Sequence, residues 1–285
     1  MTKLPLPKDA VKDVFLTCIE NYRDDALKRR LTGIVPLLSK AEEAYLQKMD
    51  VPEVHTIPAH DQVGDVTKRE MANVYETKLA GADGPGRKYY NKYMAAPRNG
   101  ICPYCGVRTV SNLDHFLPKS KYPSLAITPA NLVPACWDCN MGEKKTLAPA
   151  SARETPLHPY FDEVEGARWL AAELSVDRGV LLARYHAIKP DEWDELTFER
   201  AAFHLDFFKL KTLYGVHAAA EIENCRRRWA SIYRRLGEDG LREEFAEERD
   251  SREAVSPSSW QSALYRALSE HTDVVCVWLN ETPRP

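Results

Sequence analysis

Hydrophobic residues recur at helical spacing through the first third of the chain. This spacing predicts helices over residues 8–31 and 34–48, each with its apolar residues on one side. A third helix is expected to begin after Thr67, because Thr67-Lys-Arg-Glu70 has the pattern of a capping box. The segment from Gly81 to Gly86 contains three glycines and a proline, so it is the clearest break in this part of the chain.

The second half combines two strands with further helices. Residues 168–176 and 180–188 are rich in strand-forming residues and flank a short turn with a glycine, which predicts a hairpin. Asp191 is expected to cap a helix that continues, with more helix behind it, to about Leu236. Residues 238–253 hold eight acidic and three basic residues, so they are expected to form an exposed helix or a mobile link. A last helix is predicted near residues 257–270, and the chain is therefore mostly α.

Composition excludes few classes of protein but directs attention to one window. The chain has 285 residues, 44% of them hydrophobic, with no apolar run long enough for a membrane span and no secretory signal. We therefore expect a cytoplasmic protein. The net charge is −3, yet residues 98–150 carry six basic and three acidic residues, a local +3. A basic window in an acidic chain is modest support for a polyanionic substrate, and an ordinary solvated surface explains it equally well.

Four of the seven cysteines form two pairs in this window, Cys102-x-x-Cys105 and Cys136-x-x-Cys139. Two such turns can converge on one ion, and four thiolates are typical of a structural zinc site. The remaining cysteines lie in apolar surroundings and are expected to be small buried hydrophobic residues: Cys18, Cys225 and Cys276.

Polar residues of a different kind lie between and beside the cysteine pairs. Asp114 and His115 are adjacent, so in an extended strand one side chain can face a metal ion while the other faces a water molecule. Asn131 precedes the second pair and Asn140 follows it directly, at the expected start of a helix. Three lysines add positive charge nearby: Lys119, Lys144 and Lys145. A zinc-stapled binding module without activity would have no use for the Asp-His pair and Asn140.

These motifs, taken in order, resemble the HNH endonuclease family with its ββα-metal fold. The resemblance covers about residues 100–147 and rests on both cysteine pairs, Asp114-His115-x-x-Pro118, Asn131-Leu132 and Cys139-Asn140. Together with the break at Gly81–Gly86 and the predicted helices and hairpin, it divides the chain into three expected regions: an N-terminal helical region at 1–85, an HNH core at 86–160, and a mainly helical region with a β-hairpin at 161–285. The implied fold class is mostly α with a small zinc-stapled ββα-metal core, α+β overall.

The resemblance also implies roles for individual residues. His115 corresponds to the general base, Asp114 and Asn140 to ligands of a catalytic Mg²⁺ or Mn²⁺, and Asn131 to a brace of the loop. The four cysteines correspond to the structural zinc ligands. Lys145, Lys144 and Lys119 are candidates to hold substrate phosphate, but the lysine spacing departs from the commoner family pattern and leaves open which of them does so.

The sequence around the motif is similar to that of a narrower bacterial group, the PtuB-type HNH proteins of Septu and retron anti-phage defence systems. That similarity implies a defence effector that works with an ATPase partner. The leading expectation is therefore a metal-dependent endonuclease that hydrolyses DNA. The alternatives are a non-catalytic zinc module that binds nucleic acid or protein, and an HNH nuclease that cleaves RNA.

Overall fold

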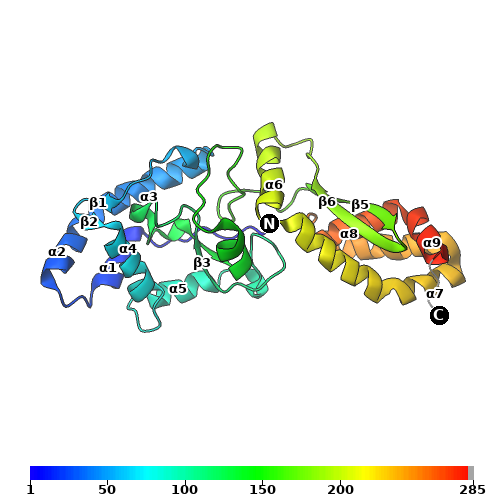
Figure 1. Ribbon diagram of the computed structural model, residues 1–285, viewed down its shortest axis with the longest axis horizontal. Helices are drawn as coiled ribbons and strands as arrows, with labels where there is room; N and C mark the ends of the chain where they lie inside the picture. Colours follow the sequence, from blue (N-terminus) through cyan, green and yellow to red (C-terminus); the bar gives the residue numbers. More distant parts are fainter. Residues whose placement is uncertain (282–285) are drawn as a thin grey trace. The chain divides into compact units, whose positions relative to one another are not determined.

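A computed structural model describes residues 1–281 (Figure 1). The chain divides into two compact units, one formed by Thr2–Asp162 and the other beginning at Glu163. The boundary expected from sequence at 160/161 lies close to this division, whereas the expected boundary at 85/86 falls inside the first unit. Each unit is described by itself.

The first unit begins with helices that only partly follow the predicted pattern. Residues 8–31 were expected to be one helix, but they form α1 and most of α2, with a break between Ile19 and Asp25. The reason is local: the Asp24 side chain accepts hydrogen bonds from the backbone N–H groups of Ala26 and Leu27, at 2.9 and 3.0 Å, and so starts a new helix. The α-helices of this unit are α1 Val11–Ile19, α2 Asp25–Gly33, α3 Val35–Asp50, α4 Lys68–Asn73 and α5 Arg87–Met94.

Two other predictions for this unit are confirmed. α3 covers the helix expected over 34–48. The capping box at Thr67 is present in both directions, with the Glu70 side chain accepting from the Thr67 backbone at 2.9 Å. Short elements connect the helices: η1 Val54–Thr56, β1 Gln62–Val63, β2 Val66–Thr67, the π-helix η2 Val74–Leu79 and η3 Arg98–Gly100.

A small ββα arrangement lies at the end of the first unit. Strand β3, Asn112–His115, pairs antiparallel with β4, Leu132–Ala135, and the π-helix η6, Asp138–Lys144, follows directly. The loop between the strands contains two short 3₁₀ turns, η4 Pro123–Leu125 and η5 Pro129–Asn131. Helix α5 packs against both strands. This arrangement in an otherwise largely helical chain confirms the predicted α+β class.

The aliphatic core of the first unit supports this hairpin from one side. Leu113 of β3 and Leu132 of β4 belong to the same buried cluster as residues of α1, α3 and α4. Burial of such side chains stabilises by roughly 1.5–3 kcal/mol each. The N-terminal helices therefore form one core with the strands that carry the candidate site.

The second unit is a β-hairpin covered by helices. β5, Leu170–Asp177, pairs antiparallel with β6, Val180–Ala187, which confirms the predicted hairpin. Its turn has positive φ at Arg178 (48°) and Gly179 (77°), as a type I′ connection requires. The helices are α6 Glu195–Phe207, α7 Leu210–Glu253, α8 Trp260–Glu270 and α9 Thr272–Glu281.

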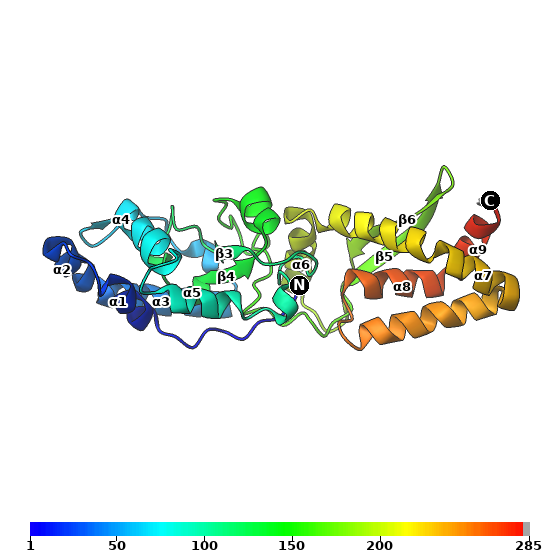
Figure 2. The same ribbon diagram turned by 90° about the horizontal axis from the view of Figure 1, so that it is seen from below.

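One prediction for this unit is wrong, and one open choice is decided by the structure. Asp194, not Asp191, caps α6, because its carboxylate accepts from the Thr197 N–H at 2.7 Å. Of the two alternatives expected for residues 238–253, the helix is the one observed: α7 bends at Gly237 (φ 71°), and its second arm returns along α8 (Figure 2). Phe245 of that arm is buried and meets Trp229 edge to face, with ring centroids 5.0 Å apart. Among residues 1–281, no helix combines the length and the apolar character needed to cross a membrane.

Candidate active site

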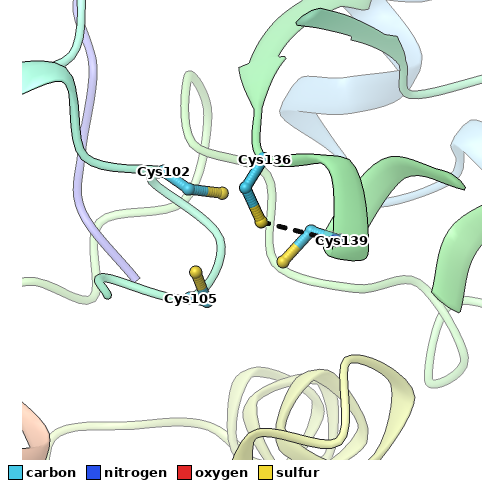
Figure 3. Close-up of side chains that lie close together, drawn as sticks. All are labelled: Cys102, Cys105, Cys136 and Cys139. Carbon is cyan, nitrogen blue, oxygen red and sulfur yellow. Dashed lines mark hydrogen bonds between the residues drawn. The ribbon is translucent and has the colours of Figure 1, made fainter. Parts of the chain in front are cut away.

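Four buried cysteine sulfurs converge between the two CxxC turns (Figure 3). The ligand atoms of Cys102, Cys105, Cys136 and Cys139 all lie within 4.8 Å of one another. Zinc–sulfur bonds of about 2.3 Å in a tetrahedron require sulfur–sulfur separations of roughly 3.8 Å, so the cluster fits such an ion. This is a site that can hold a metal such as zinc.

Backbone hydrogen bonds shape each turn for ligation. The Arg108 N–H points to Cys105 Sγ at 3.5 Å, and the Cys139 N–H points to Cys136 Sγ at 3.4 Å. Gly106, with φ of 65°, closes the first turn by donating from its N–H to the Cys102 carbonyl at 2.8 Å. Hydrogen bonds within the cluster lower the pKa of the Cys105 and Cys136 thiols and raise that of the Cys102 and Cys139 thiols. A metal ion binds the thiolate form, so ligation by all four would release protons.

The other three cysteines take no part in this cluster. Cys18 and Cys276 are buried, as predicted, whereas Cys225 is only half-buried. Desolvation raises the pKa of Cys18 to about 12, so this thiol stays protonated and behaves as a small hydrophobic residue.

Asp114 is held on both carboxylate oxygens by groups from the first CxxC turn and from η6. Lys144 Nζ lies 3.0 Å from Asp114 Oδ1, and the Tyr104 hydroxyl donates to Asp114 Oδ2, also at 3.0 Å. The exposed fraction of the side chain is only 1% for Asp114 and 2% for Lys144. Lys144 Nζ also donates to the carbonyl of His115 at 2.5 Å, so one ammonium ties the two neighbouring residues to η6.

His115 is oriented by its Nε2 atom. This nitrogen lies 2.9 Å from the carbonyl oxygen of Ala126, so Nε2 carries the proton and donates, and Nδ1 is left as an acceptor. The ring packs edge to face on Tyr75, with centroids 4.4 Å apart. Burial, and then the positive charge of Lys119, lowers the pKa of His115 to about 3. The imidazole is therefore neutral at physiological pH.

Asn131 braces the loop that leads from β3. Its Oδ1 accepts from the Leu117 N–H at 2.7 Å, and its Nδ2 donates to the carbonyls of Leu117 and Leu125 at 3.0 and 3.1 Å. The residue is fully buried. All of these contacts are with the backbone of the chain, and the same loop supplies the carbonyl of Ala126 that orients His115.

Asn140 lies inside η6 and not at its start. The cap of this helix is Trp137, so the expectation that the helix starts at Asn140 is wrong. Its Nδ2 donates to Asn112 Oδ1 at 2.6 Å and to the Leu113 carbonyl at 3.5 Å. These bonds place the amide of Asn140 beside β3, two residues before Asp114.

A hollow of about 360 Å³ collects most of the candidate residues. Asp114 and His115 of β3 line it together with Asn140 of η6, and Lys119 and Lys145 lie on its wall. A hollow of similar size between α2 and α4 contains the Arg30–Glu70 ion pair but none of the candidate residues.

The three candidate lysines have different positions. Lys144 is buried on Asp114 and does not line the hollow, so its position does not fit the prediction that it contacts phosphate. The next residue, Lys145, is exposed and has a positive φ of 52°. Lys119 pairs with Glu76 at 3.5 Å and lies over the ring of Tyr75, 5.3 Å from its centroid.

Several residues at the site were not anticipated from the sequence. Tyr104 lies between the first two cysteines and Asn112 lies two positions before Asp114, a spacing that places alternate strand residues on one face. Tyr75 comes from the helical region and gives no local signal. Trp137 and Met141 line the hollow with large exposed side chains.

A hard divalent ion suits the oxygen donors of Asp114 and Asn140, which both line the hollow. The two hydrogen bonds that Asp114 accepts occupy about two of roughly four lone-pair sites on a carboxylate, so acceptor capacity remains. The Lys144 ammonium nevertheless already compensates the charge of Asp114. The donor set therefore fits the ion, with Lys144 as a competing cation.

Comparisons with known proteins agree with this geometry. Residues 102–146 match the family model described as HNH endonuclease, so this segment of the chain is similar to an HNH domain. The match begins at Cys102, the first cysteine of the cluster, and ends just after η6, and it therefore contains the four-cysteine cluster and the ββα arrangement.

One curated protein is similar along almost the whole chain, and a second is similar over about a quarter of it. Protein ea31 of Escherichia phage lambda is 27% identical over 295 residues, which cover 96% of this chain and 98% of that protein. Septu protein PtuB of Bacillus thuringiensis is 34% identical over 82 residues, only 27% of this chain and 31% of that protein. No solved structure matches the chain at a significant level.

Proposed function

We propose that this protein is a metal-dependent endonuclease that hydrolyses DNA phosphodiester bonds, with His115 as the general base. One observation carries the proposal: His115 lines the hollow while its Nε2 donates to the Ala126 carbonyl at 2.9 Å. That hydrogen bond leaves Nδ1 unprotonated, so this nitrogen is the one that can accept a proton. A neutral imidazole oriented in this way accepts a proton from an attacking water molecule.

Asp114 and Asn140 are the residues that would hold a catalytic Mg²⁺ or Mn²⁺. When bound, such an ion supplies positive charge that neutralises the phosphate and stabilises the leaving oxygen. The chain's own contribution is to keep the carboxylate in place, because Tyr104 and Lys144 each hold one of its oxygens. Lys144 thus acts on the reaction through Asp114 and the backbone of His115.

The other site residues have supporting roles in this proposal. Asn131 braces the loop that orients His115, and the four cysteines bind a structural zinc ion that joins the two turns. Lys145 and Lys119 hold substrate phosphate, because both line the hollow and Lys145 is exposed. The basic side chains bind the backbone without reading sequence.

Cleavage assays test the proposal directly. The full chain is incubated with supercoiled plasmid, linear duplex, single-stranded DNA and RNA of the same sequence, in EDTA, Mg²⁺ or Mn²⁺. Metal-dependent nicking or cutting of DNA is expected. Cleavage of RNA alone would replace DNA as the substrate. Absence of any cleavage, with and without partner proteins, would leave a non-catalytic zinc module as the better account.

We also propose that the protein is the effector of a bacterial anti-phage system and works in the cytoplasm with an ATPase. The support is the partial similarity to Septu protein PtuB, a protein of a defence system. A four-thiolate site is suited to a reducing compartment. The helical regions at 1–85 and 161–285 are the proposed docking surfaces for the partner.

The defence role is tested separately from the nuclease, because the relative that matches from end to end comes from a phage. An ATPase encoded beside this gene is co-expressed, and the two proteins are purified through a tag on one of them. Co-elution and a drop in phage plaques that depends on both genes are expected. Full activity of the chain alone, with no co-elution, contradicts the partner.

A further inference from the structure

Two large apolar side chains stand exposed at the rim of the hollow. Trp137 is 62% exposed and Met141 is 48% exposed, and both line the hollow with His115. They are four residues apart, at the cap and within the body of η6, and so lie about one turn from each other. Exposed apolar groups gathered at a concave site are typical of a surface that a ligand covers.

The backbone beneath Trp137 is held by the cysteine turn. Trp137 directly follows Cys136, and the Cys139 N–H bonds to Cys136 Sγ at 3.4 Å. The Asn140 N–H donates to the Cys136 carbonyl at 3.1 Å, which closes the first turn of η6. An indole with only two side-chain torsions on such a backbone loses little entropy when a ligand covers it.

Cationic groups lie on the same hollow as these apolar groups. Lys145 and Lys119 line it, and Lys145 has the positive φ of 52° that non-glycine residues adopt rarely. A positively charged groove combined with an aromatic surface is the usual composition of a site for unpaired nucleic acid: the cations hold phosphates and the ring stacks on a base. Base pairs inside a duplex are stacked on their neighbours and offer no face to such a ring.

We propose that Trp137 and Met141 form a stacking surface for an unpaired nucleobase of the DNA strand that enters the hollow. This inference rests on the proposed nuclease function and specifies its substrate: DNA with single-stranded character at or beside the cut. The stacked base sets the position of its own phosphate relative to His115, and Lys145 holds that phosphate.

Binding to a probe base tests this assignment. Oligonucleotides of about 12 nucleotides carry one 2-aminopurine, whose fluorescence is quenched by stacking. Affinity and quenching are measured with full-length His115→Ala protein, which leaves the DNA uncut, for the single strand and for the duplex of the same sequence. One further substitution is made at a time in the His115→Ala protein: Trp137→Ala, Trp137→Phe or, as a control, Val216→Ala. The control removes an exposed apolar side chain from α7.

The single strand is expected to bind better than the duplex and to be quenched. Trp137→Ala should weaken single-strand binding about 5- to 100-fold and abolish the quenching, while Trp137→Phe keeps most of both. Val216→Ala should match the parent. Unchanged single-strand binding and quenching in Trp137→Ala overturns the assignment, as does an equal loss on duplex and single strand. A parent that binds neither DNA overturns the proposed function as well.

Discussion

Lys144 Nζ lies 3.0 Å from Asp114 Oδ1, and both side chains are almost completely buried. A buried ion pair contributes little relative to apolar residues, but removal of one partner leaves an uncompensated buried charge. Lys145, its neighbour in sequence, is exposed. The two lysines therefore offer a matched comparison.

Lys144→Met should lower the free energy of unfolding by about 3–5 kcal/mol, because Asp114 loses its counter-charge. Lys145→Met should change it by less than about 0.5 kcal/mol, as substitutions at exposed positions usually do. Urea unfolding of the zinc-loaded protein, with no Mg²⁺ or Mn²⁺ added, measures both. If the two variants are equally stable, the ion pair is not formed in solution.

Addition of Mn²⁺ should restore part of this loss. The divalent ion can replace the missing ammonium at Asp114, and a ligand that binds only the folded state stabilises it. The melting temperature of Lys144→Met is expected to rise more with Mn²⁺ than that of the wild type. An equal rise in both proteins would contradict competition between Lys144 and the ion.

Cys139→Ser should abolish metal binding at the four-cysteine cluster and unfold the HNH domain, because structural zinc contributes roughly 10 kcal/mol or more in small zinc-dependent folds. Cys276→Ser is the control, since Cys276 is also buried but lies outside the cluster. Elemental analysis should find one zinc per chain in the control and none in Cys139→Ser. Zinc retained by Cys139→Ser would show that the cluster is not the binding site.

The pH dependence of stability should reveal the Arg30–Glu70 pair in the helical region. Hydrogen bonding to Arg30 lowers the pKa of Glu70 from 4.5 to about 2. As the pH falls, the Glu70 carboxylate takes up its proton earlier in the unfolded chain than in the folded one. Its contribution to the free energy of unfolding is therefore complete above about pH 4.5 and is lost as the pH falls towards 2.

Glu70→Gln isolates the charge, because glutamine keeps the acceptor of the capping box. At pH 7 the free energy of unfolding of the wild type should be higher than that of Glu70→Gln by about 1–2 kcal/mol, after allowance for the partial exposure of the ion pair. The gap should narrow when urea unfolding is repeated at about pH 3. A gap that is independent of pH would mean that the ionised carboxylate contributes nothing.

Features encoded in neighbouring residues were predictable from the sequence. The two CxxC turns, the capping box at Thr67 and the β5–β6 hairpin depend on contacts within a few residues, and the structure contains all of them. The prediction that Asp191 caps α6 failed, and the reason is also local. Asp191 and Asp194 are equally good caps in isolation, and only the residue at which α6 begins decides between them.

The burial of Lys144 could not be read from the sequence in the same way. The Lys145 N–H bonds to the Asn140 carbonyl, a spacing of five residues that widens the last turn of η6. In a regular α-helix these two side chains would point in other directions. Which of Lys144 and Lys145 is buried therefore depends on this wide turn, which the residue pattern does not predict. Tyr75 reaches His115 from a distant helix, which is a tertiary contact with no sequence signal.

In the proposed function His115 performs the chemistry, whereas the four clustered cysteines hold the fold. Plasmid nicking in Mg²⁺ and Mn²⁺, with zinc content measured on the same samples, compares the wild type with His115→Ala and with the control His186→Ala, an exposed histidine on β6. His115→Ala should keep its zinc and its fold and lose at least about 100-fold in rate, as expected for loss of a general base. His186→Ala should match the wild type. Equal nicking by His115→Ala and wild type, at equal zinc content, would contradict the account.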